Sequence, residues 1–341
     1  MSRPVRVAIN GYGRIGRCFL RALYESPLQD RFEVVAINEP ADLDSMVYLT
    51  RFDSTHGIFP GKIEQGTACL IVNGKKIPVS HGSTPEDVDW KSLDFDFLIE
   101  CSGHYGKRAD LNRFLEAGCP RLLLSHPGAS GREVDLTVVY GVNEQKILGA
   151  ELLVSNASCT TNAIVPILDQ LHTAFGVDHA FLTTLHSVMN DQPLIDGYHH
   201  SDLRRTRSAM QSIVPVSTGL AQGVERLLPY LTGRVQAKAI RVPTLNVSAI
   251  DLVVNLARDV TVQDISALMT RAATQQPNLL AYATSPRASV DFNHDPHSAI
   301  VDGSQIRTNG AGFANLLVWF DNEWGFANRM LDVLKVWSER R

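Results

Sequence analysis

Cysteine is scarce in this chain. Its 341 residues include five cysteines, and no two of them show C-x-x-C spacing. An odd number of scattered cysteines argues against a disulfide framework or a zinc site and suits a reducing cytoplasm. We therefore expect a cytoplasmic protein without a bound metal ion. The five residues are Cys18, Cys69, Cys101, Cys119 and Cys159.

Long apolar runs and a strong charge imbalance are also absent. No apolar run approaches the roughly 18 residues of a membrane span, and the N-terminus lacks the pattern of a signal peptide. The net charge of −4 argues against broad binding to nucleic acids or membrane surfaces. A composition with 44% hydrophobic and 20% charged residues is ordinary for a globular protein. The length favours two domains.

The N-terminal segment follows the order strand, G-x-G-x-x-G, helix, strand, acid. The apolar run 5–10 predicts a buried strand, and Gly11-Tyr12-Gly13-Arg14-Ile15-Gly16 follows at once. An amphipathic helix is expected to about Glu25, and a second strand over 32–37 ends shortly before Glu39. This order is the context that a dinucleotide-binding fingerprint requires.

Each part of this fingerprint has a physical role. Gly11 permits the tight turn, Gly13 lets the backbone approach a pyrophosphate, and Gly16 allows close packing of helix on strand. The helix N-terminus faces the phosphate charge. The carboxylate of Glu39 can accept both ribose hydroxyls and would repel a 2′-phosphate, which favours NAD over NADP. The other interpretation of Glu39 is a solvated loop acid.

Alternating strands and helices continue through the N-terminal half. Ser102 and Gly103 follow one expected strand at its carboxyl end, where parallel sheets bind ligands. The alternation predicts an α/β Rossmann domain with a doubly wound, mostly parallel sheet. The further strands are expected at 70–72, 95–100, 122–125 and 136–139, with a helix at 107–117.

Strands with segregated helices follow in the C-terminal half. This pattern predicts an α+β catalytic domain. We expect an NAD-binding domain over residues 1–158, completed by a C-terminal helix over 322–341, and a catalytic domain over 159–321. The expected strands lie at 181–186, 236–242, 247–257, near Ser289 and at 316–320, and the expected helices at 218–227, 262–274 and 325–339.

One cysteine stands at the start of a predicted helix. The segment Ser158-Cys159-Thr160-Thr161-Asn162 joins an expected strand over 151–154 to a helix over 159–175. Backbone N–H groups at a helix N-terminus carry partial positive charge, so a thiol there ionises more readily and gives the nucleophilic thiolate. The flanking hydroxyls of Ser158 and Thr160 could donate to a bound oxyanion. The other interpretation is a buried structural cysteine.

Three further features of the C-terminal half could carry chemistry. His186 ends a predicted strand and could act as a general base, although a lone histidine is often structural. Arg205, Arg207 and Arg241 could bind phosphate, or could form a solvated or subunit-contact surface. Asn322 could hold a cofactor amide, or cap the final helix. A nucleotide fold, a thiol, a base and anion-binding groups in one chain favour the functional interpretations.

Four segments carry a resemblance to a known family. They are Ile9-Asn10-Gly11-Tyr12-Gly13-Arg14-Ile15-Gly16-Arg17, Ser155-Asn156-Ala157-Ser158-Cys159-Thr160-Thr161-Asn162, Arg241-Val242-Pro243-Thr244 and Asp321-Asn322-Glu323-Trp324-Gly325. Through them the chain resembles the glyceraldehyde-3-phosphate dehydrogenase superfamily over essentially its whole length. The resemblance implies a two-domain homotetramer that oxidises a phosphorylated aldehyde with NAD.

The resemblance also implies roles for individual residues. Cys159 matches the family's nucleophile and His186 its partner base. The stretch 187–212 matches the loop that reaches a neighbouring subunit. Cofactor contacts are implied at Gly11, Gly13, Arg14, Ile15, Gly16, Glu39, Ser102, Gly103, Ser125 and Asn322. Contacts to the substrate or to phosphate are implied at Ser158, Thr160, Arg205, Thr218, Gly219 and Arg241.

Departures from the family pattern point to one branch. Glycolytic members have a phosphate-binding threonine three residues after the catalytic histidine, where this chain has Met189. Segments such as Ile37-Asn38-Glu39 and Asp202-Leu203-Arg204-Arg205-Thr206-Arg207 look closer to the D-erythrose-4-phosphate dehydrogenases. That likeness implies oxidation of D-erythrose 4-phosphate to 4-phospho-D-erythronate through a cysteine thioester resolved by water, which feeds pyridoxal 5′-phosphate biosynthesis.

Other functions remain open at this point. The alternative is a phosphorylating glyceraldehyde-3-phosphate dehydrogenase, which shares Cys159, His186 and the NAD domain. A non-catalytic NAD-binding regulator would keep the fold without needing that pair. Nucleic-acid binding gains no support from the net negative charge.

Overall fold

The structure is a computed structural model that describes residues 3–340. Contacts between residues divide the chain into two compact units. Unit 1 comprises Met1–Ser158 and Ala327–Arg341, and unit 2 comprises Cys159–Phe326. Within the described residues, no helix is both long and apolar enough to cross a lipid bilayer.

Unit 1 contains a nine-stranded sheet in the order β10-β11-β9-β8-β1-β2-β7-β6-β5. The strand pairs from β10 to β7 are parallel, and β5, β6 and β7 form an antiparallel meander at one edge. Its strands are β1 (Val5–Asn10), β2 (Phe32–Asn38), β5 (Ile63–Gly66), β6 (Cys69–Val72), β7 (Lys75–Ser80), β8 (Phe97–Glu100), β9 (Leu122–Leu124), β10 (Leu136–Thr137) and β11 (Leu153–Ser155). A separate pair consists of β3 (Phe52–Asp53) and β4 (Gly57–Ile58).

Helices of unit 1 pack their apolar faces against buried residues. Helix α1 (Arg14–Glu25) buries Phe19, Leu20 and Leu23, which are spaced to lie on one side of a helix. The indole of Trp337 in α7 (Trp324–Glu339) lies 4.9 Å, centroid to centroid, from the Phe97 ring at the start of β8. Two shorter helices are α2 (Leu43–Arg51) and α3 (Arg108–Glu116).

Unit 2 contains a mixed eight-stranded sheet. The order is β13-β14-β12-β15-β19-β17-β16, with β18 paired to β19. Strand β12 runs antiparallel to β15 but parallel to β14, and His186 and Arg241 are register partners in the parallel pair. The strands are β12 (Val177–His186), β13 (Val214–Val216), β14 (Val235–Arg241), β15 (Ser248–Leu256), β16 (Leu280–Ala283), β17 (Ala299–Asp302), β18 (Arg307–Thr308) and β19 (Phe313–Phe320).

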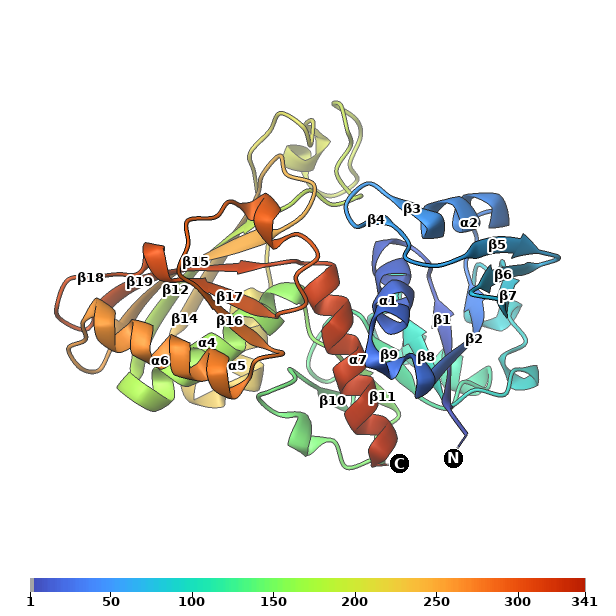
Figure 1. Ribbon diagram of the computed structural model, residues 1–341, viewed down its shortest axis with the longest axis horizontal. Coiled ribbons are helices and arrows are strands. Elements are labelled where there is room, and N and C mark those ends of the chain that lie inside the picture. Colours follow the sequence, from blue (N-terminus) through green and yellow to red (C-terminus); the bar gives the residue numbers. More distant parts are fainter. Residues whose placement is uncertain (1–2, 341) are drawn as a thin grey trace. The chain divides into compact units, whose positions relative to one another are not determined.

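Three helices cover one face of the unit 2 sheet. They are α4 (Cys159–Phe175), α5 (Leu220–Leu227) and α6 (Val262–Gln275), and Figure 1 shows them side by side along that sheet. Helix α4 is central because it contacts both α5 and α6 as well as β12 and β15. Its buried Ile164, Ile167, Leu168 and Leu171 form the stripe that the sequence predicts. The first residue of α4 is Cys159.

The predicted fold class is confirmed, with two local corrections. The strand expected near Ser289 is wrong, because Ser289–Phe292 forms a 3-10 turn in which the Asp291 carboxylate accepts the backbone N–H of Ala288 at 2.8 Å. The strand expected over 136–139 ends at Thr137. The Asn143 side chain accepts the Val139 N–H at 2.8 Å, so the backbone turns away from the sheet.

Replacing Trp337 with alanine tests the packing of α7 on β8. Trp337 is fully buried, so Trp337→Ala should reduce the free energy of unfolding by about 3–5 kcal/mol. Glu339→Ala on the same helix is the control. Its ion pair with Arg31 (2.8 Å) joins two partly exposed side chains, and its loss should cost no more than about 1 kcal/mol. Urea unfolding followed by circular dichroism measures both; equal losses would contradict this account.

Candidate active site

The glycine-rich turn after β1 has the close approaches that a dinucleotide site needs. Gly11 has a φ of +84°, and a Cβ there would come within 2.4 Å of the Ser102 nitrogen. A Cβ on Gly16 would come within 2.2 Å of the Gly11 carbonyl oxygen. A Cβ on Gly13 would meet no atom within 4 Å. Packing within unit 1 therefore does not require glycine at position 13. A ligand that approaches the backbone there would require it, because a side chain would block the approach.

A pocket lies beside this turn at the carboxyl ends of β1, β2 and β8. Glu39 reaches over the turn: one carboxylate oxygen accepts the Tyr12 N–H at 2.7 Å and the other accepts the Ala41 N–H at 3.1 Å. Each oxygen keeps a further lone pair for a ribose hydroxyl. Four of the residues expected at the cofactor line this pocket, namely Gly11, Gly13, Glu39 and Ser102.

Five other residues expected at the cofactor belong to unit 1, at or beside the same turn and strand ends. The Arg14 guanidinium at the start of α1 is ion-paired with Asp53. Ile15 and Gly16 belong to the first turn of α1. Gly103 follows β8, and the N–H of Ser125, directly after β9, donates to the Glu100 carbonyl at 3.0 Å.

A buried polar cluster lies at the same strand ends, and the sequence analysis missed it. Glu100 is fully buried and accepts hydrogen bonds from the Asn10 side chain (2.5 Å) and the Ser102 N–H (2.8 Å). Asn38 in turn donates to Asn10 Oδ1 at 2.8 Å. Burial raises the pKa of Glu100 to about 7, against the opposing effect of the bonds from Ser102 and Asn10. The sequence does contain a signal for this cluster, because a polar residue ends each of three strands: Asn10 in β1, Asn38 in β2 and Glu100 in β8.

Cys159 and His186 come together in unit 2. The Sγ atom lies 3.7 Å from His186 Nε2, although the residues belong to α4 and β12. His186 Nδ1 lies 2.8 Å from the carbonyl oxygen of Ser187. A carbonyl only accepts, so Nδ1 carries the hydrogen in the neutral ring, and Nε2 faces the sulfur as a proton acceptor.

Burial controls the charge state of this pair. Cys159 keeps partial exposure as a residue, but its sulfur is surrounded by protein. Burial raises the thiol pKa to about 12, and the N–H groups of Thr160 and Cys159 offset this only in part. The helix N-terminus thus acts on this thiol in the expected direction, and burial outweighs it. Burial also lowers the pKa of His186 below its usual value.

Asn322 is oriented by two serines at the end of β12 and the start of β15. Its Oδ1 accepts from the Ser187 hydroxyl at 3.0 Å and the Ser248 hydroxyl at 2.8 Å, which leaves Nδ2 as the donating side of the amide. The final helix has another cap, because Asp321 Oδ1 accepts the Trp324 N–H at 2.7 Å. The alternative role of Asn322 as that cap is thus excluded, and its contact to a cofactor amide stays a prediction.

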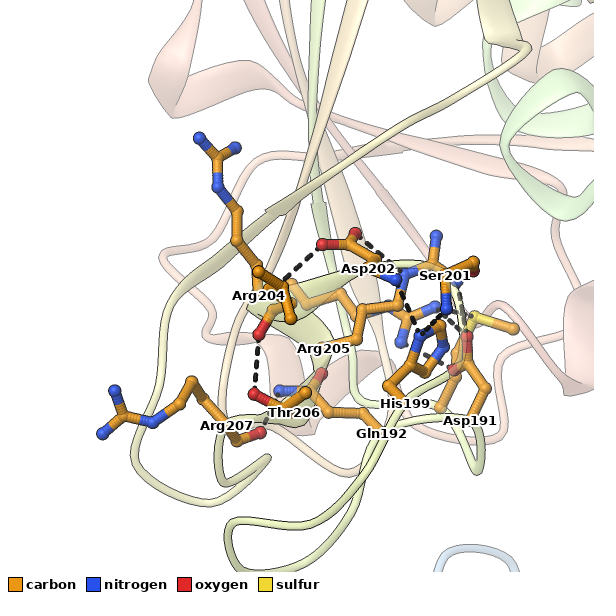
Figure 2. A network of polar contacts seen from close by, with 12 residues as sticks. Asp191, Gln192, His199, Ser201, Asp202, Arg204, Arg205, Thr206 and Arg207 are labelled. Atoms are coloured by element: carbon orange, nitrogen blue, oxygen red, sulfur yellow. Dashed lines mark hydrogen bonds and ion pairs between the residues drawn. The ribbon is translucent and has the colours of Figure 1, made fainter.

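Two of the three arginines considered for phosphate binding, Arg205 and Arg241, converge on one carboxylate. Arg241 ends β14 beside His186 and binds Asp191 through both terminal nitrogens. Arg205 binds the same side chain at 2.9 Å, and Figure 2 shows Asp191 and Arg205 close together. Arg207 lies apart on the surface, paired with Asp196 at 3.0 Å. The sequence analysis assigned no role to Asp191.

The other residues expected at phosphate lie at the starts of α4 and α5. Ser158 and Thr160 flank Cys159 in the chain, and Gly219 precedes the first residue of α5. The two helices are close there: a Cβ on Gly223 in α5 would come within 3.0 Å of the Thr161 hydroxyl. Thr218 Oγ1 accepts the Leu220 N–H at 3.2 Å at the start of α5.

Two family models match this chain. The model described as "Glyceraldehyde 3-phosphate dehydrogenase, NAD binding domain" matches residues 5–108. The model described as "Glyceraldehyde 3-phosphate dehydrogenase, C-terminal domain" matches residues 158–322. The first includes the glycine-rich turn and Glu39, and the second includes Cys159, His186 and Asn322.

Fold, site and these matches define the class of protein. The chain is an NAD-dependent oxidoreductase that acts on an aldehyde group. It belongs to the glyceraldehyde 3-phosphate dehydrogenase family.

Substitution of the histidine tests the 3.7 Å contact between His186 and Cys159. His186→Asn removes the proton acceptor and should lower kcat for NAD reduction about 10²–10⁴-fold, while Cys159→Ser should abolish turnover. The control is His179→Asn, an exposed histidine on the same strand, which should change kcat less than twofold. Stopped-flow absorbance at the reduced-nicotinamide band measures all three. A His186→Asn enzyme with near-normal kcat would show that Nε2 accepts no proton in the reaction.

The buried carboxyl of Glu100 should make stability depend on pH. Its pKa is raised from 4.5 to about 7 in the folded chain, so the folded state holds this proton more tightly than the unfolded state. The Glu100 contribution to stability therefore falls as pH rises from about 4.5 through about 7. Glu100→Gln removes this titration, and the variant should gain roughly 3 kcal/mol relative to the parent between pH 4.5 and 8.

Denaturant unfolding at several pH values measures that gain. The comparison uses the slope with pH, because a glutamine amide facing the Asn10 amide adds an offset that does not depend on pH. Glu116→Gln, an exposed residue of α3, controls for the change in net charge. Parallel pH profiles for Glu100→Gln and the parent would mean that Glu100 does not titrate in this range.

Proposed function

We propose that this enzyme oxidises D-erythrose 4-phosphate to 4-phospho-D-erythronate, with NAD as acceptor and water as the group that releases the product. The product would feed pyridoxal 5′-phosphate biosynthesis. Membership of the family supports the aldehyde chemistry. The choice of substrate depends on the residues around Arg241.

Cys159 and His186 carry out the bond-forming and proton-transfer steps of the proposed reaction. The Cys159 sulfur attacks the aldehyde carbon as its proton passes to His186 Nε2, 3.7 Å away. Developing negative charge on the aldehyde oxygen is stabilised by the Cys159 N–H at the start of α4. NAD, when bound, accepts the hydride that leaves this carbon, and a thioester to Cys159 results. His186 releases its first proton to solvent, then takes a proton from the water that attacks the thioester and returns it to the Cys159 sulfur as the product leaves.

The main support for the substrate assignment is the residue that lies beside Arg241. Glycolytic members of the family have a phosphate-binding threonine three residues after the histidine. Here that position is Met189, whose sulfur lies 3.5 Å from Arg241 Nη2 and offers no hydroxyl. A phosphate group therefore has fewer donors here, as expected for a longer sugar phosphate whose phosphate lies differently, and for an enzyme that does not use inorganic phosphate.

Exposed apolar side chains support a homotetramer. Leu194, Ile195, Tyr198 and Leu203 lie in the stretch 187–212 and are at least two-thirds exposed. Clustered exposed apolar residues mark protein–protein contact sites, and this stretch matches the family's subunit-contact loop. All five cysteines are free thiols, which agrees with a cytoplasmic location.

Steady-state NAD reduction with two aldehydes tests the proposal. D-erythrose 4-phosphate and D-glyceraldehyde 3-phosphate are each supplied with and without inorganic phosphate. We expect a kcat/KM at least about tenfold higher for the four-carbon sugar, a discrimination that corresponds to roughly 1.4 kcal/mol, and a rate that does not change with phosphate. Preference for the triose with an absolute phosphate requirement would replace this assignment with the phosphorylating glyceraldehyde-3-phosphate dehydrogenase.

A further inference from the structure

A chain of hydrogen bonds links the carboxyl ends of four neighbouring strands beside the cofactor pocket. The strands are β8, β1, β2 and β7, which are adjacent in the sheet of unit 1. The Ser80 hydroxyl donates to Asn38 Oδ1 at 2.9 Å, and Asn38 Nδ2 donates to Asn10 Oδ1 at 2.8 Å. Asn10 Nδ2 donates to Glu100 Oε2 at 2.5 Å, and the Ser102 N–H donates to Glu100 Oε1 at 2.8 Å. All of these bonds therefore run toward the Glu100 carboxyl group.

Gly82 fixes the direction of this chain, because each of its backbone groups has only one role. Its N–H donates to Asn38 Oδ1 at 2.9 Å, and its carbonyl oxygen accepts from Asn38 Nδ2 at 3.0 Å. The Asn38 amide therefore has a single orientation, in which Nδ2 donates to Asn10. Asn10 must in turn present its own Nδ2 to Glu100, so this side of the carboxyl group meets a donor only.

Ser102 is the partner of Glu100 that can reverse its role. Its hydroxyl also donates to Glu100 Oε1, but a hydroxyl can accept as well as donate, whereas an N–H or an NH2 group here only donates. When Glu100 takes up a proton, Oε1–H can donate to Ser102 Oγ, and the Ser102 O–H then turns away from Glu100. Ser102 lines the cofactor pocket, so the reversal offers this hydrogen to a ligand.

The reversible hydroxyl belongs to a residue that packs against the glycine-rich turn. Asn10 and Glu100 are register partners in β1 and β8, and Gly11 directly follows Asn10. A Cβ on Gly11 would come within 2.4 Å of the Ser102 nitrogen. The pyrophosphate of a dinucleotide lies at such a turn. Its negative charge disfavours a carboxylate nearby and favours a hydroxyl that donates.

Burial holds Glu100 close to the pH at which this change would occur. Burial raises the pKa of its carboxyl group to about 7. The neighbouring strands β1 and β9 place Asn10 and Leu124 opposite Glu100, and neither of these side chains titrates. The titratable groups that interact electrostatically with Glu100 have pKa values that burial raises, so they stay uncharged near neutral pH; they include Cys101, Tyr105 and Cys119.

We propose that Glu100 is a positioning residue that takes up a proton when the dinucleotide binds and thereby turns the Ser102 hydroxyl toward the cofactor. The proton comes from solvent and bonds to Glu100 Oε1, and only hydrogen bonds are exchanged otherwise. NAD therefore binds more weakly as the pH rises through the range in which Glu100 ionises in the free enzyme. This coupling acts on the cofactor and does not depend on which aldehyde the enzyme oxidises.

A purely structural role for Glu100 predicts a different pH profile. If the carboxylate only holds residues 101–105 in place, its replacement weakens NAD binding by the same factor at every pH. If Glu100 takes up a proton, Glu100→Gln mimics the protonated form, because its amide N–H can donate to Ser102 Oγ as the acid O–H would. The pH dependence that Glu100 contributes is then lost.

The test is isothermal titration of NAD into the full-length enzyme at pH 6 and at pH 8.5, at constant ionic strength and without aldehyde. Between these pH values the Kd of the parent should rise about five- to tenfold more than the Kd of Glu100→Gln, since one like charge nearby raises the pKa of a carboxyl group by about one pH unit. His81 contacts Glu39, and His104 lines the pocket. Both histidines remain in both proteins, so the difference between the profiles reports Glu100.

Two controls accompany this titration. Glu116→Gln removes a carboxylate at an exposed position of α3 and should keep the profile of the parent. Titrations at pH 7.5 in two buffers of different ionisation enthalpy count the protons taken up, and the parent should take up about half a proton more per NAD than Glu100→Gln. A thermal melt shows that each variant is folded.

Two results would overturn the proposal. A parent Kd that does not rise with pH would do so whether or not Glu100→Gln folds. Parallel profiles of the parent and Glu100→Gln, displaced by a constant factor, would assign Glu100 a structural role only.

Discussion

Parallel pairing of strands is the constraint on which both candidate sites depend. Parallel strands end at the same edge, so the residues that follow them gather there although they are far apart in the chain. In unit 1 this brings together the turn after β1, Glu39 after β2 and Ser102 after β8. In unit 2 the parallel pair of β12 and β14, within a largely antiparallel sheet, places His186 beside Arg241.

Burial then shifts the pKa values of the groups that meet at these edges. Glu100 and Cys159 both have raised pKa values although each accepts hydrogen bonds or lies at a helix N-terminus. Both cases show that burial outweighs a few favourable dipoles when the charged form has no counter-ion. Asp191 shows the converse: it is more exposed, two guanidinium groups face it, and its pKa is lowered.

Local sequence patterns predicted the parts of the fold that have strong periodicity. The first βαβ unit and helix α4 have clear apolar periodicity and characteristic flanking residues, and both lie where we expected them. The prediction of a strand near Ser289 failed because the Asp291 side chain accepts the Ala288 N–H and stabilises a turn, an interaction that a hydrophobic pattern does not reveal. The meander strands β5 and β7 are partly exposed and contain no continuous apolar run, so they lacked a signal.

The candidate site was predictable as a set of residue types but not as a set of partners. Motifs identified Cys159, His186 and the arginines, and the structure shows that Cys159 and His186 are in contact. No motif could reveal that Asp191 holds both Arg205 and Arg241, because that contact joins residues up to 50 positions apart. The serine pair that orients Asn322 was missed for the same reason.

The carboxylate of Glu39 has a second consequence, for the evolution of cofactor preference. It anchors the Tyr12 N–H of the glycine-rich turn as well as standing where ribose hydroxyls are expected. A basic replacement at position 39 would favour a 2′-phosphate but would leave that N–H without a side-chain acceptor. A change from NAD to NADP that uses a basic residue at this position therefore needs a second substitution to hold the turn.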